Sequence, residues 1–174
     1  MKTARITLLI AGCAAATVLT AMAAGIQINV TPSYPIGIYQ ITHEPITKGS
    51  IVIFCPPDNA ATQQALNRGY IMAGFCPGGY SPLIKKVFAM KGDAVRISAD
   101  GVFVNGSPLP NSKPKSVDSA GRPLPIATVN TQALSSDIVL LMSDYNSKSF
   151  DARYFGTVKW SQIISTASPI LTWQ

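Results

Sequence analysis

Beyond residue 26, short apolar runs separated by turn residues dominate this chain. Ser50–Cys55 is almost continuously apolar and stops at two prolines, and Ile138–Met142 is apolar throughout, so both are expected to be buried strands. Gly37–Ile41 and Ala94–Ser98 alternate between apolar and polar residues, which is typical of half-buried strands. The pattern therefore predicts a mainly β domain.

One short helix is expected within this domain. Ala, Gln and Leu favour a helix over Asn59–Arg68, with Asp58 as its N-cap and Gly69 as its end. Asp100-Gly101 predicts a two-residue hairpin turn, and Asn105-Gly106 predicts a second turn soon after it.

Other stretches are expected to be a further strand, loops and the final strands. Pro82–Met90 is apolar except for two lysines and is expected to be a strand. Gly74–Gly79 has the composition of a loop, and residues 107–130, rich in Pro, Ser, Lys and Gly, predict a long surface excursion. Val158–Thr166 is expected to supply one or two final strands.

The N-terminal residues follow a different pattern. Lys2 and Arg5 form a positive end, and the uncharged stretch that follows reaches the roughly 20 residues that span a bilayer. Ala21-Met22-Ala23 also offers a small-x-small cleavage pattern. Residues 1–26 therefore fit either an uncleaved anchor or a cleaved signal peptide, and in both cases residues 27–174 are exported, since the positive end stays inside.

Composition limits the classes of function. A hydrophobic fraction of 47% and a charged fraction of 13% describe a folding chain of one domain rather than a disordered one. The net charge of +6 includes the two cations of the N-terminal segment, and the remainder shows no dense basic run with interleaved aromatic residues. We therefore expect no nucleic-acid partner.

The three cysteines fit an exported domain. Cys13 falls in the apolar segment, which leaves Cys55 and Cys76 as an even pair, either a structural disulfide or two buried free thiols. The spacing is not CxxC and His43 is the single histidine, so we expect no metal and no cofactor. His43 lies in a surface-turn sequence, which argues against a Ser-His-Asp triad.

Ser33 is the first candidate for chemistry. Pro32 and Pro35 restrict the backbone on either side of it, which suits a nucleophile that must present its hydroxyl in one direction. The hydroxyl of Thr31 and the backbone N–H of Ser33 are candidate donors to a developing oxyanion. Taken alone, the same stretch also fits a proline-rich turn that leads away from a membrane anchor.

Lys85 is the second candidate, because it lies in an otherwise apolar run. In a strand, Lys85 and Lys86 point to opposite faces, so one can enter the interior. Burial lowers the pKa of a lysine by up to about 3–5 units, which makes its amine a base near neutral pH. The alternative is a pair of lysines on an edge strand whose charged ends reach solvent.

The third candidate segment is Ser149–Gly156. Asp151 and Arg153 are expected on the same side of an extended segment, where they can pair. Ser149 offers a hydroxyl able to orient a neutral amine, and Asp144 lies close enough in sequence to belong to the same region.

Together these segments resemble the signal peptidase I family of Ser/Lys peptidases (S26), in its conjugative-transfer branch, the TraF-type peptidases. The most specific stretches are Thr31–Tyr39, Leu83–Asp93 and Ser149–Gly156. Cys55-Pro56-Pro57 and Gly74–Gly79 resemble that branch in particular. The resemblance implies an antiparallel β domain with these roles: nucleophile Ser33, general base Lys85, oxyanion donor Thr31, lysine-orienting hydroxyl Ser149, supporting pair Asp151–Arg153 and basic neighbour Lys86.

The chain also departs from the type I pattern. Tyr34 and Pro35 directly follow the serine where Met is usual, Ser143-Asp144-Tyr145 replaces Gly-Asp-Asn, and Ala152 replaces a serine. These departures fit the specialised conjugative branch better than a housekeeping peptidase.

The resemblance implies an activity and partners. The substrate is a conjugative pilin precursor, which loses a short C-terminal peptide and is then cyclised through an acyl-enzyme. The chain acts on the periplasmic side of the inner membrane, with other conjugation or type IV secretion components as further partners. Two alternatives stay open: a conventional leader peptidase, and a non-catalytic β scaffold of the envelope apparatus.

Overall fold

Two antiparallel sheets make up the fold of the computed structural model, which describes residues 12, 16, 20 and 23–173. The larger sheet has seven strands in the order β1-β2-β12-β3-β5-β10-β11. Their bounds are β1 Ile26–Asn29, β2 Ile36–Thr42, β3 Ile51–Phe54, β5 Leu83–Ala89, β10 Ile138–Met142, β11 Val158–Lys159 and β12 Ile163–Trp173. The prediction of a mainly β domain is confirmed.

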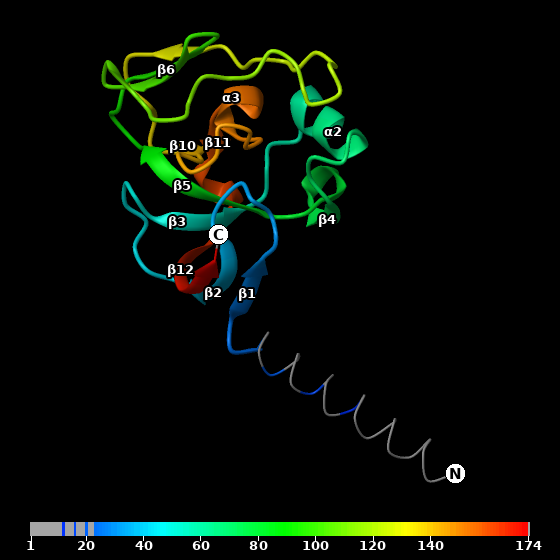
Figure 1. The fold of residues 1–174 in the computed structure, drawn as a ribbon. Helices are drawn as coiled ribbons and strands as arrows, with labels where there is room; N and C mark the ends of the chain where they lie inside the picture. Colours follow the sequence, from blue (N-terminus) through cyan, green and yellow to red (C-terminus); the bar gives the residue numbers. More distant parts are fainter. Residues whose placement is uncertain (1–11, 13–15, 17–19, 21–22, 174) are drawn as a thin grey trace.

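The smaller sheet has four strands in the order β8-β7-β6-β9. Their bounds are β6 Val95–Ser98, β7 Gly101–Val104, β8 Ser107–Pro108 and β9 Val129–Thr131. Figure 1 shows this sheet at the top of the molecule, with the one-turn helix α3 (Ala152–Phe155) beneath it and β1, β2 and β12 at the bottom. The main core packs Val52 and Val87 of the larger sheet with Val95 and Ile97 of the smaller one.

Helix α2 (Ala60–Asn67) is the predicted short helix, but its N-cap is Asn59 rather than Asp58. The side chain of Asn59 accepts a hydrogen bond from the backbone N–H of Thr62. Asp58 instead accepts a hydrogen bond from the hydroxyl of the fully buried Tyr80. Gly69 follows the helix with φ +73°, so the predicted glycine stop is confirmed.

The first predicted hairpin turn was placed one residue too late. Ser98 and Gly101 are paired across β6 and β7, so Ala99 and Asp100 form the two-residue loop and Gly101 begins the next strand. The second turn, Asn105-Gly106, is confirmed: it connects β7 to β8, and both residues have positive φ.

Two segments are more regular than their sequences suggested. Gly74–Gly79 is not a simple loop, because β4 (Ala73–Cys76) precedes a 3₁₀ turn over Pro77–Gly79 and pairs through bridges with Tyr80. Strand β12 continues past the expected Thr166 to Trp173, since β2 provides a pairing partner for it as far as Ile36. That pairing is so close that a Cβ on Gly37 would lie 2.2 Å from the Leu171 carbonyl oxygen.

A disulfide joins Cys55, at the end of β3, to Cys76 of β4. It closes a loop across a sequence separation of 21 residues, and Cys76 itself is buried against Tyr80 and Ala65. Of the two alternatives for this cysteine pair, the structure has the disulfide.

The expected anchor or signal peptide over residues 1–26 lies almost entirely outside the described residues, as does Cys13. No helix among the residues that the structure describes is long and apolar enough to cross a membrane. The choice between anchor and cleaved leader, with cleavage near Ala23, stays a prediction.

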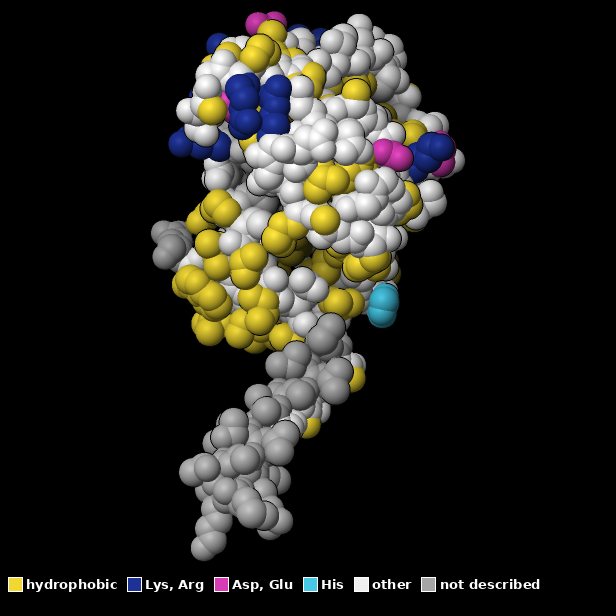
Figure 2. All heavy atoms as spheres, turned by 90° about the vertical axis from the view of Figure 1, so that its right-hand side faces the viewer, with side chains coloured by type: hydrophobic (Ala, Val, Ile, Leu, Met, Phe, Trp, Pro, Cys, Tyr) yellow, Lys and Arg dark blue, Asp and Glu magenta, His cyan; other side chains and the backbone are white. Residues whose placement is uncertain are grey.

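Apolar side chains gather at the end of the domain where the chain enters it. Figure 2 shows hydrophobic surface on the lower part of the molecule and basic side chains toward the top. The exposed hydrophobic residues of this lower end include Ile28 and Val30 beside β1, and Ile170, Leu171 and Trp173 in the last part of β12. Exposed apolar side chains are therefore gathered around β1 and the last part of β12.

Removing the disulfide should destabilise the fold by about 3 kcal/mol, because the unfolded chain then regains the entropy of an open loop. We expect Cys55→Ala, Cys76→Ala and the double variant to lose similar amounts, since each breaks the same bond. Urea unfolding of the full chain measures the difference, and reduced wild-type protein is the matched control. Unequal losses in the three variants would contradict this account.

Candidate active site

Lys85 lies in the middle of β5, between β3 and β10 in the larger sheet. Val52 is its register partner on β3, and the side chain is 1% exposed. Lys86 points to the opposite face, as strand alternation requires, and its ammonium pairs with Asp144. The predicted division of the two lysines is confirmed, and Lys85 is the one inside.

The ammonium of Lys85 donates to the hydroxyl of Ser33 at 3.0 Å and to the carbonyl of Ile84 at 3.1 Å. Burial lowers its pKa from 10.5 to about 8, the nearby negative charge of Asp151 partly opposes this, and the positive charge of Arg153 adds to the lowering. A substantial fraction of Lys85 is therefore neutral near pH 8 and can accept a proton.

Ser33 lies in the turn that joins β1 to β2. Its side chain is half-buried, so the hydroxyl can touch Lys85 on one side and still face an incoming group. The turn is tied to a distant loop, because the side-chain amide of Asn146 donates to the carbonyl of Pro32 at 2.9 Å. A serine and a lysine 52 residues apart thus meet within hydrogen-bonding distance.

Thr31 Oγ1 lies 3.2 Å from Ser33 Oγ. Its hydroxyl donates to Asn29 Oδ1 at 2.9 Å, so it is already engaged. To serve as an oxyanion donor it must rotate away from that oxygen, a rotation that leaves Oγ1 in place.

Asp151 and Arg153 form a fully buried pair, but not in the extended segment expected from the sequence. Asp151 is the N-cap of α3, since its side chain accepts a hydrogen bond from the backbone N–H of Arg153. Arg153 lies within that helix. Two parallel bonds, both 2.7 Å, join the guanidinium to the carboxylate. Asp151 also accepts from the backbone N–H of Ser143.

The remaining guanidinium hydrogens are directed at backbone carbonyls. Arg153 donates to the carbonyl oxygens of Asn111, Asn146, Ser147 and Ser149 at 2.7–3.1 Å. Because every donor has an acceptor, the buried charge holds the 143–149 loop in one shape. This loop in turn places Asn146 against Pro32.

Ser149 is brought into this region but not into contact with the lysine. It is 2% exposed, and its hydroxyl finds no hydrogen-bond partner among the described residues. The structure therefore does not join Ser149 to Lys85, in contrast to the expectation of a lysine-orienting contact.

Asp144, which pairs with Lys86, lies close enough to Tyr34 for its charge to act on the tyrosine hydroxyl. Burial, with further contributions from the negative charge of Asp144 and from Tyr39, raises the pKa of Tyr34 to about 12. The ring of Tyr34 is 6.4 Å from that of Tyr145. Tyr34 belongs to the turn that bears the serine, so this contact joins the turn to the 143–149 loop.

His43 is exposed and belongs to no helix or strand, as expected for a solvated loop histidine.

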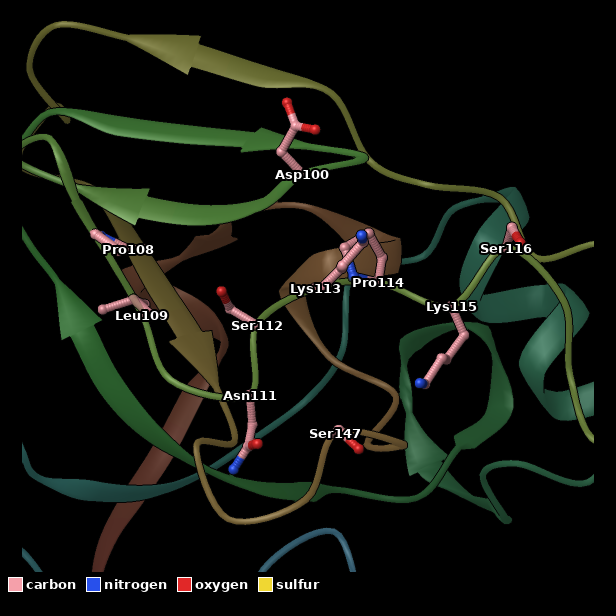
Figure 3. Close-up of a pocket in the computed structure, with 10 residues that line it drawn as sticks. All are labelled: Asp100, Pro108, Leu109, Asn111, Ser112, Lys113, Pro114, Lys115, Ser116 and Ser147. Atoms are coloured by element: carbon pink, nitrogen blue, oxygen red, sulfur yellow. The ribbon is translucent and has the colours of Figure 1, made fainter.

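A separate hollow of about 600 Å³ is lined mostly by residues of the 107–130 excursion (Figure 3). Ser147 forms part of its wall, but neither Ser33 nor Lys85 does. This hollow is therefore distinct from the Ser33–Lys85 pair.

Asn29 and Asn146 are two contributors that the sequence reasoning missed. Asn29 closes β1 and is 7% exposed, whereas Asn146 lies in the 143–149 loop. The signal for Asn29 was a polar residue at the end of a short alternating segment, four positions before a serine that lies between two prolines. For Asn146 no local signal existed, because its partner lies 114 residues away.

Replacing Lys85 with Met should stabilise the folded protein at pH 6–7 by about 3 kcal/mol, since a pKa lowered by 2–3 units reflects a cost of that size. The folded pKa lies below the unfolded one, so the full cost is present below pH 8 and fades as the pH rises toward 10.5. Urea unfolding at pH 6 and pH 10 measures the gain. Exposed Lys113→Met is the control and should show little change, and an equal gain for Lys85→Met at both pH values would refute the burial argument.

Comparison with known proteins places these residues in a family. The model of the family described as signal peptidase, peptidase S26, matches residues 1–173. A plasmid transfer protein TraF of Escherichia coli is 49% identical over 151 residues, covering 87% of this chain and 85% of that protein. A probable conjugal transfer protein TraF of Sinorhizobium fredii is 38% identical over 162 residues, covering 92% and 84%. A signal peptidase I structure from Enterococcus faecalis V583 aligns at 16% identity with a TM-score of 0.41, over 73% of this chain and 100% of that one. The chain belongs to the S26 family of signal peptidases.

Proposed function

We propose that the chain is a serine peptidase in which Ser33 is the nucleophile and Lys85 is the general base. The observation that carries the proposal is the 3.0 Å contact between the Ser33 hydroxyl and an amine that is 1% exposed. A base within hydrogen-bonding reach of the hydroxyl, with a pKa near the working pH, meets both requirements for removing its proton.

The proposed reaction proceeds through an acyl-enzyme. Neutral Lys85 takes the hydroxyl proton while Ser33 Oγ attacks the scissile carbonyl, and the protonated amine then passes the proton to the leaving nitrogen. The products of this half-reaction are a Ser33 ester and a free peptide amine. Attack on the ester by water gives an acid, whereas attack by an amine gives a new amide and restores the Ser33 hydroxyl.

Thr31 and the backbone N–H of Ser33 are the proposed oxyanion donors. Thr31 Oγ1 lies beside Ser33 Oγ, and its hydrogen can turn from the neutral Asn29 oxygen toward the charged oxygen of the tetrahedral intermediate. A charge-assisted hydrogen bond is stronger than the neutral one that it replaces, which favours this rotation in the transition state.

Ser149, Asp151, Arg153 and Lys86 are proposed as supporting residues. The Asp151–Arg153 pair fixes the loop against Pro32, and both charges act on the Lys85 amine. The buried hydroxyl of Ser149 is the proposed partner that orients the neutral Lys85 amine before the amine takes the Ser33 proton. Lys86 anchors Asp144 next to Tyr34.

The proposed substrate is a conjugative pilin precursor. The relatives at 49% and 38% identity are a plasmid transfer and a probable conjugal transfer protein TraF, which supports a role in conjugation rather than in general export. Removal of a short C-terminal peptide followed by attack of the pilin's own N-terminal amine on the acyl-enzyme would produce a ring. A conventional leader peptidase uses the same residues on exported precursors instead.

The proposed location is the periplasmic side of the inner membrane. Several exposed apolar residues, among them Ile28 and Val30, lie in or directly after β1, which follows the apolar N-terminal segment in the sequence. A disulfide between Cys55 and Cys76 suits an oxidising compartment. Both features fit a domain held at the outer surface of that membrane next to the conjugation apparatus.

Ser33→Ala and Lys85→Ala should each abolish pilin maturation at unchanged protein level, because each removes one half of the reacting pair. Co-expression with the pilin precursor, followed by mass spectrometry of the pilin, measures the outcome. Wild-type chain should give a product lighter than the linear mature peptide by one water if the ring closes, and of linear mass if water resolves the acyl-enzyme.

Exposed Ser161→Ala and Lys113→Ala are matched controls and should process the pilin normally. Normal maturation with Ser33→Ala would overturn the peptidase assignment and favour a non-catalytic scaffold. Cleavage of exported preproteins without pilin cleavage would favour the conventional leader peptidase.

The activity should also depend on pH through Lys85. Because the base acts only when neutral and its pKa is lowered to about 8, kcat/KM should rise about tenfold per pH unit below pH 8 and level off above it. Initial rates of pilin cleavage between pH 6 and pH 10 test this expectation. Lys85→Arg should be inactive throughout, since a guanidinium does not lose its proton in this range.

A further inference from the structure

The side chain of Asn29 lies inside the turn that carries Ser33. It is 7% exposed at the end of β1, and its amide nitrogen donates to three backbone carbonyl oxygens, those of Thr31, Tyr34 and Pro35, at 3.0–3.1 Å. These three carbonyls surround Ser33 on both sides in the sequence. One side chain therefore gathers the ends of the turn around the serine.

The amide oxygen of Asn29 makes a second set of contacts. It accepts from the backbone N–H of Thr31 at 3.2 Å and from the Thr31 hydroxyl at 2.9 Å. Reversing the amide would direct its oxygen at three carbonyl oxygens and its nitrogen at two donors from Thr31, so the contacts fix its orientation.

The sequence explains why a side chain is needed here. Pro32 and Pro35 have no backbone N–H, so this turn has few donors of its own for its carbonyl groups. Carbonyl oxygens that face inward need partners, and the amide of Asn29 supplies two hydrogens that the three acceptors share.

A continuous line of hydrogen bonds links Asn29 to the amine of Lys85. Asn29 Oδ1 contacts Thr31 Oγ1, Thr31 Oγ1 contacts Ser33 Oγ at 3.2 Å, and Ser33 Oγ contacts Lys85 Nζ at 3.0 Å. Since Asn29 Oδ1 can only accept, the Thr31 hydroxyl points away from Ser33 in this arrangement and presents a lone pair to it.

We infer that Asn29 is a positioning residue that holds Thr31 and Ser33 in register with Lys85; the inference rests on the proposed peptidase function. Asn29 touches neither the substrate nor the proton in transit. Its effect is to set where Ser33 Oγ lies relative to the amine and where Thr31 Oγ1 lies relative to the oxyanion. A misplacement of about 1 Å in such an arrangement can lower the rate about 100-fold.

Asn29→Ala tests the positioning role. Because alanine can form none of the five hydrogen bonds of the Asn29 side chain, kcat for pilin cleavage should fall about 100-fold. KM should change by less than about twofold, because the substrate surface is untouched. The midpoint of the pH profile should stay at the wild-type value, since the charged groups that face Lys85, namely Asp151 and Arg153, are unchanged.

Asn29→Asp separates geometry from charge and keeps the side-chain shape. It retains the acceptor for Thr31 but loses the three donations and places a carboxylate at the far end of the hydrogen-bonded line. We expect a loss of kcat together with an alkaline shift of about one pH unit in the midpoint, because a nearby negative charge favours the protonated amine. If Asn29 only stabilised the fold, the midpoint of the pH profile would be the same in Asn29→Asp and in Asn29→Ala.

Asn130→Ala, on an exposed position of β9, is the matched control and should retain wild-type kinetics. Thermal unfolding of all variants shows that each is folded at the assay temperature. The positioning role is wrong if Asn29→Ala keeps kcat within threefold of wild type and Asn29→Asp leaves the midpoint of the pH profile unmoved. If Ser33→Ala is inactive in the same assay, the peptidase assignment still stands. If Ser33→Ala is active as well, the proposed function itself has failed.

Discussion

The burial of one amine in the larger sheet is the constraint on which the site depends. Lys85 lies between β3 and β10 at 1% exposure, where water cannot stabilise its charge, so its pKa falls to about 8. The nearest oxygens to which it donates are the Ser33 hydroxyl and one carbonyl. An amine in so dry a position needs a fixed partner, and the turn between β1 and β2 supplies it.

Positioning that partner requires contacts over long sequence distances. The Asp151–Arg153 pair is fully buried, and the guanidinium binds four carbonyl groups in addition to the carboxylate. It thereby fixes a loop whose Asn146 reaches Pro32 from the outside, while Asn29 binds the same turn from the inside. The turn that carries the serine is thus restrained by two polar side chains, neither of which carries a net charge.

The sequence predicted those features that depend on local patterns and failed on those that depend on distant partners. The buried strands around Val52 and Leu140, the opposed directions of Lys85 and Lys86, and the Asn105-Gly106 turn follow from periodicity and turn chemistry. Asp58 was a wrong N-cap because the distant Tyr80 hydroxyl engages it. The pairing of Asp151 with Arg153 was predicted correctly, but in an extended segment. In the structure the pair lies at the start of helix α3, which Asp151 caps. The contacts of a single side chain within a turn, such as those of Asn29, become visible only in the coordinates of the turn.

The burial that suits Lys85 to the proposed role of base also destabilises the fold. Lowering a lysine pKa by 2–3 units costs about 3–4 kcal/mol, a large part of the net stability of a domain of this size. The disulfide stabilises the fold next to the site, because it ties the end of β3, the strand that pairs with Lys85, to β4. The positive charge of Arg153 instead adds to the cost, and the negative charge of Asp151 partly opposes it. A histidine base with an ordinary pKa near 6.5 would not need such support. The disulfide at the end of β3 and the buried Asp151–Arg153 pair of α3 therefore restrain the fold in the region where it holds a buried amine.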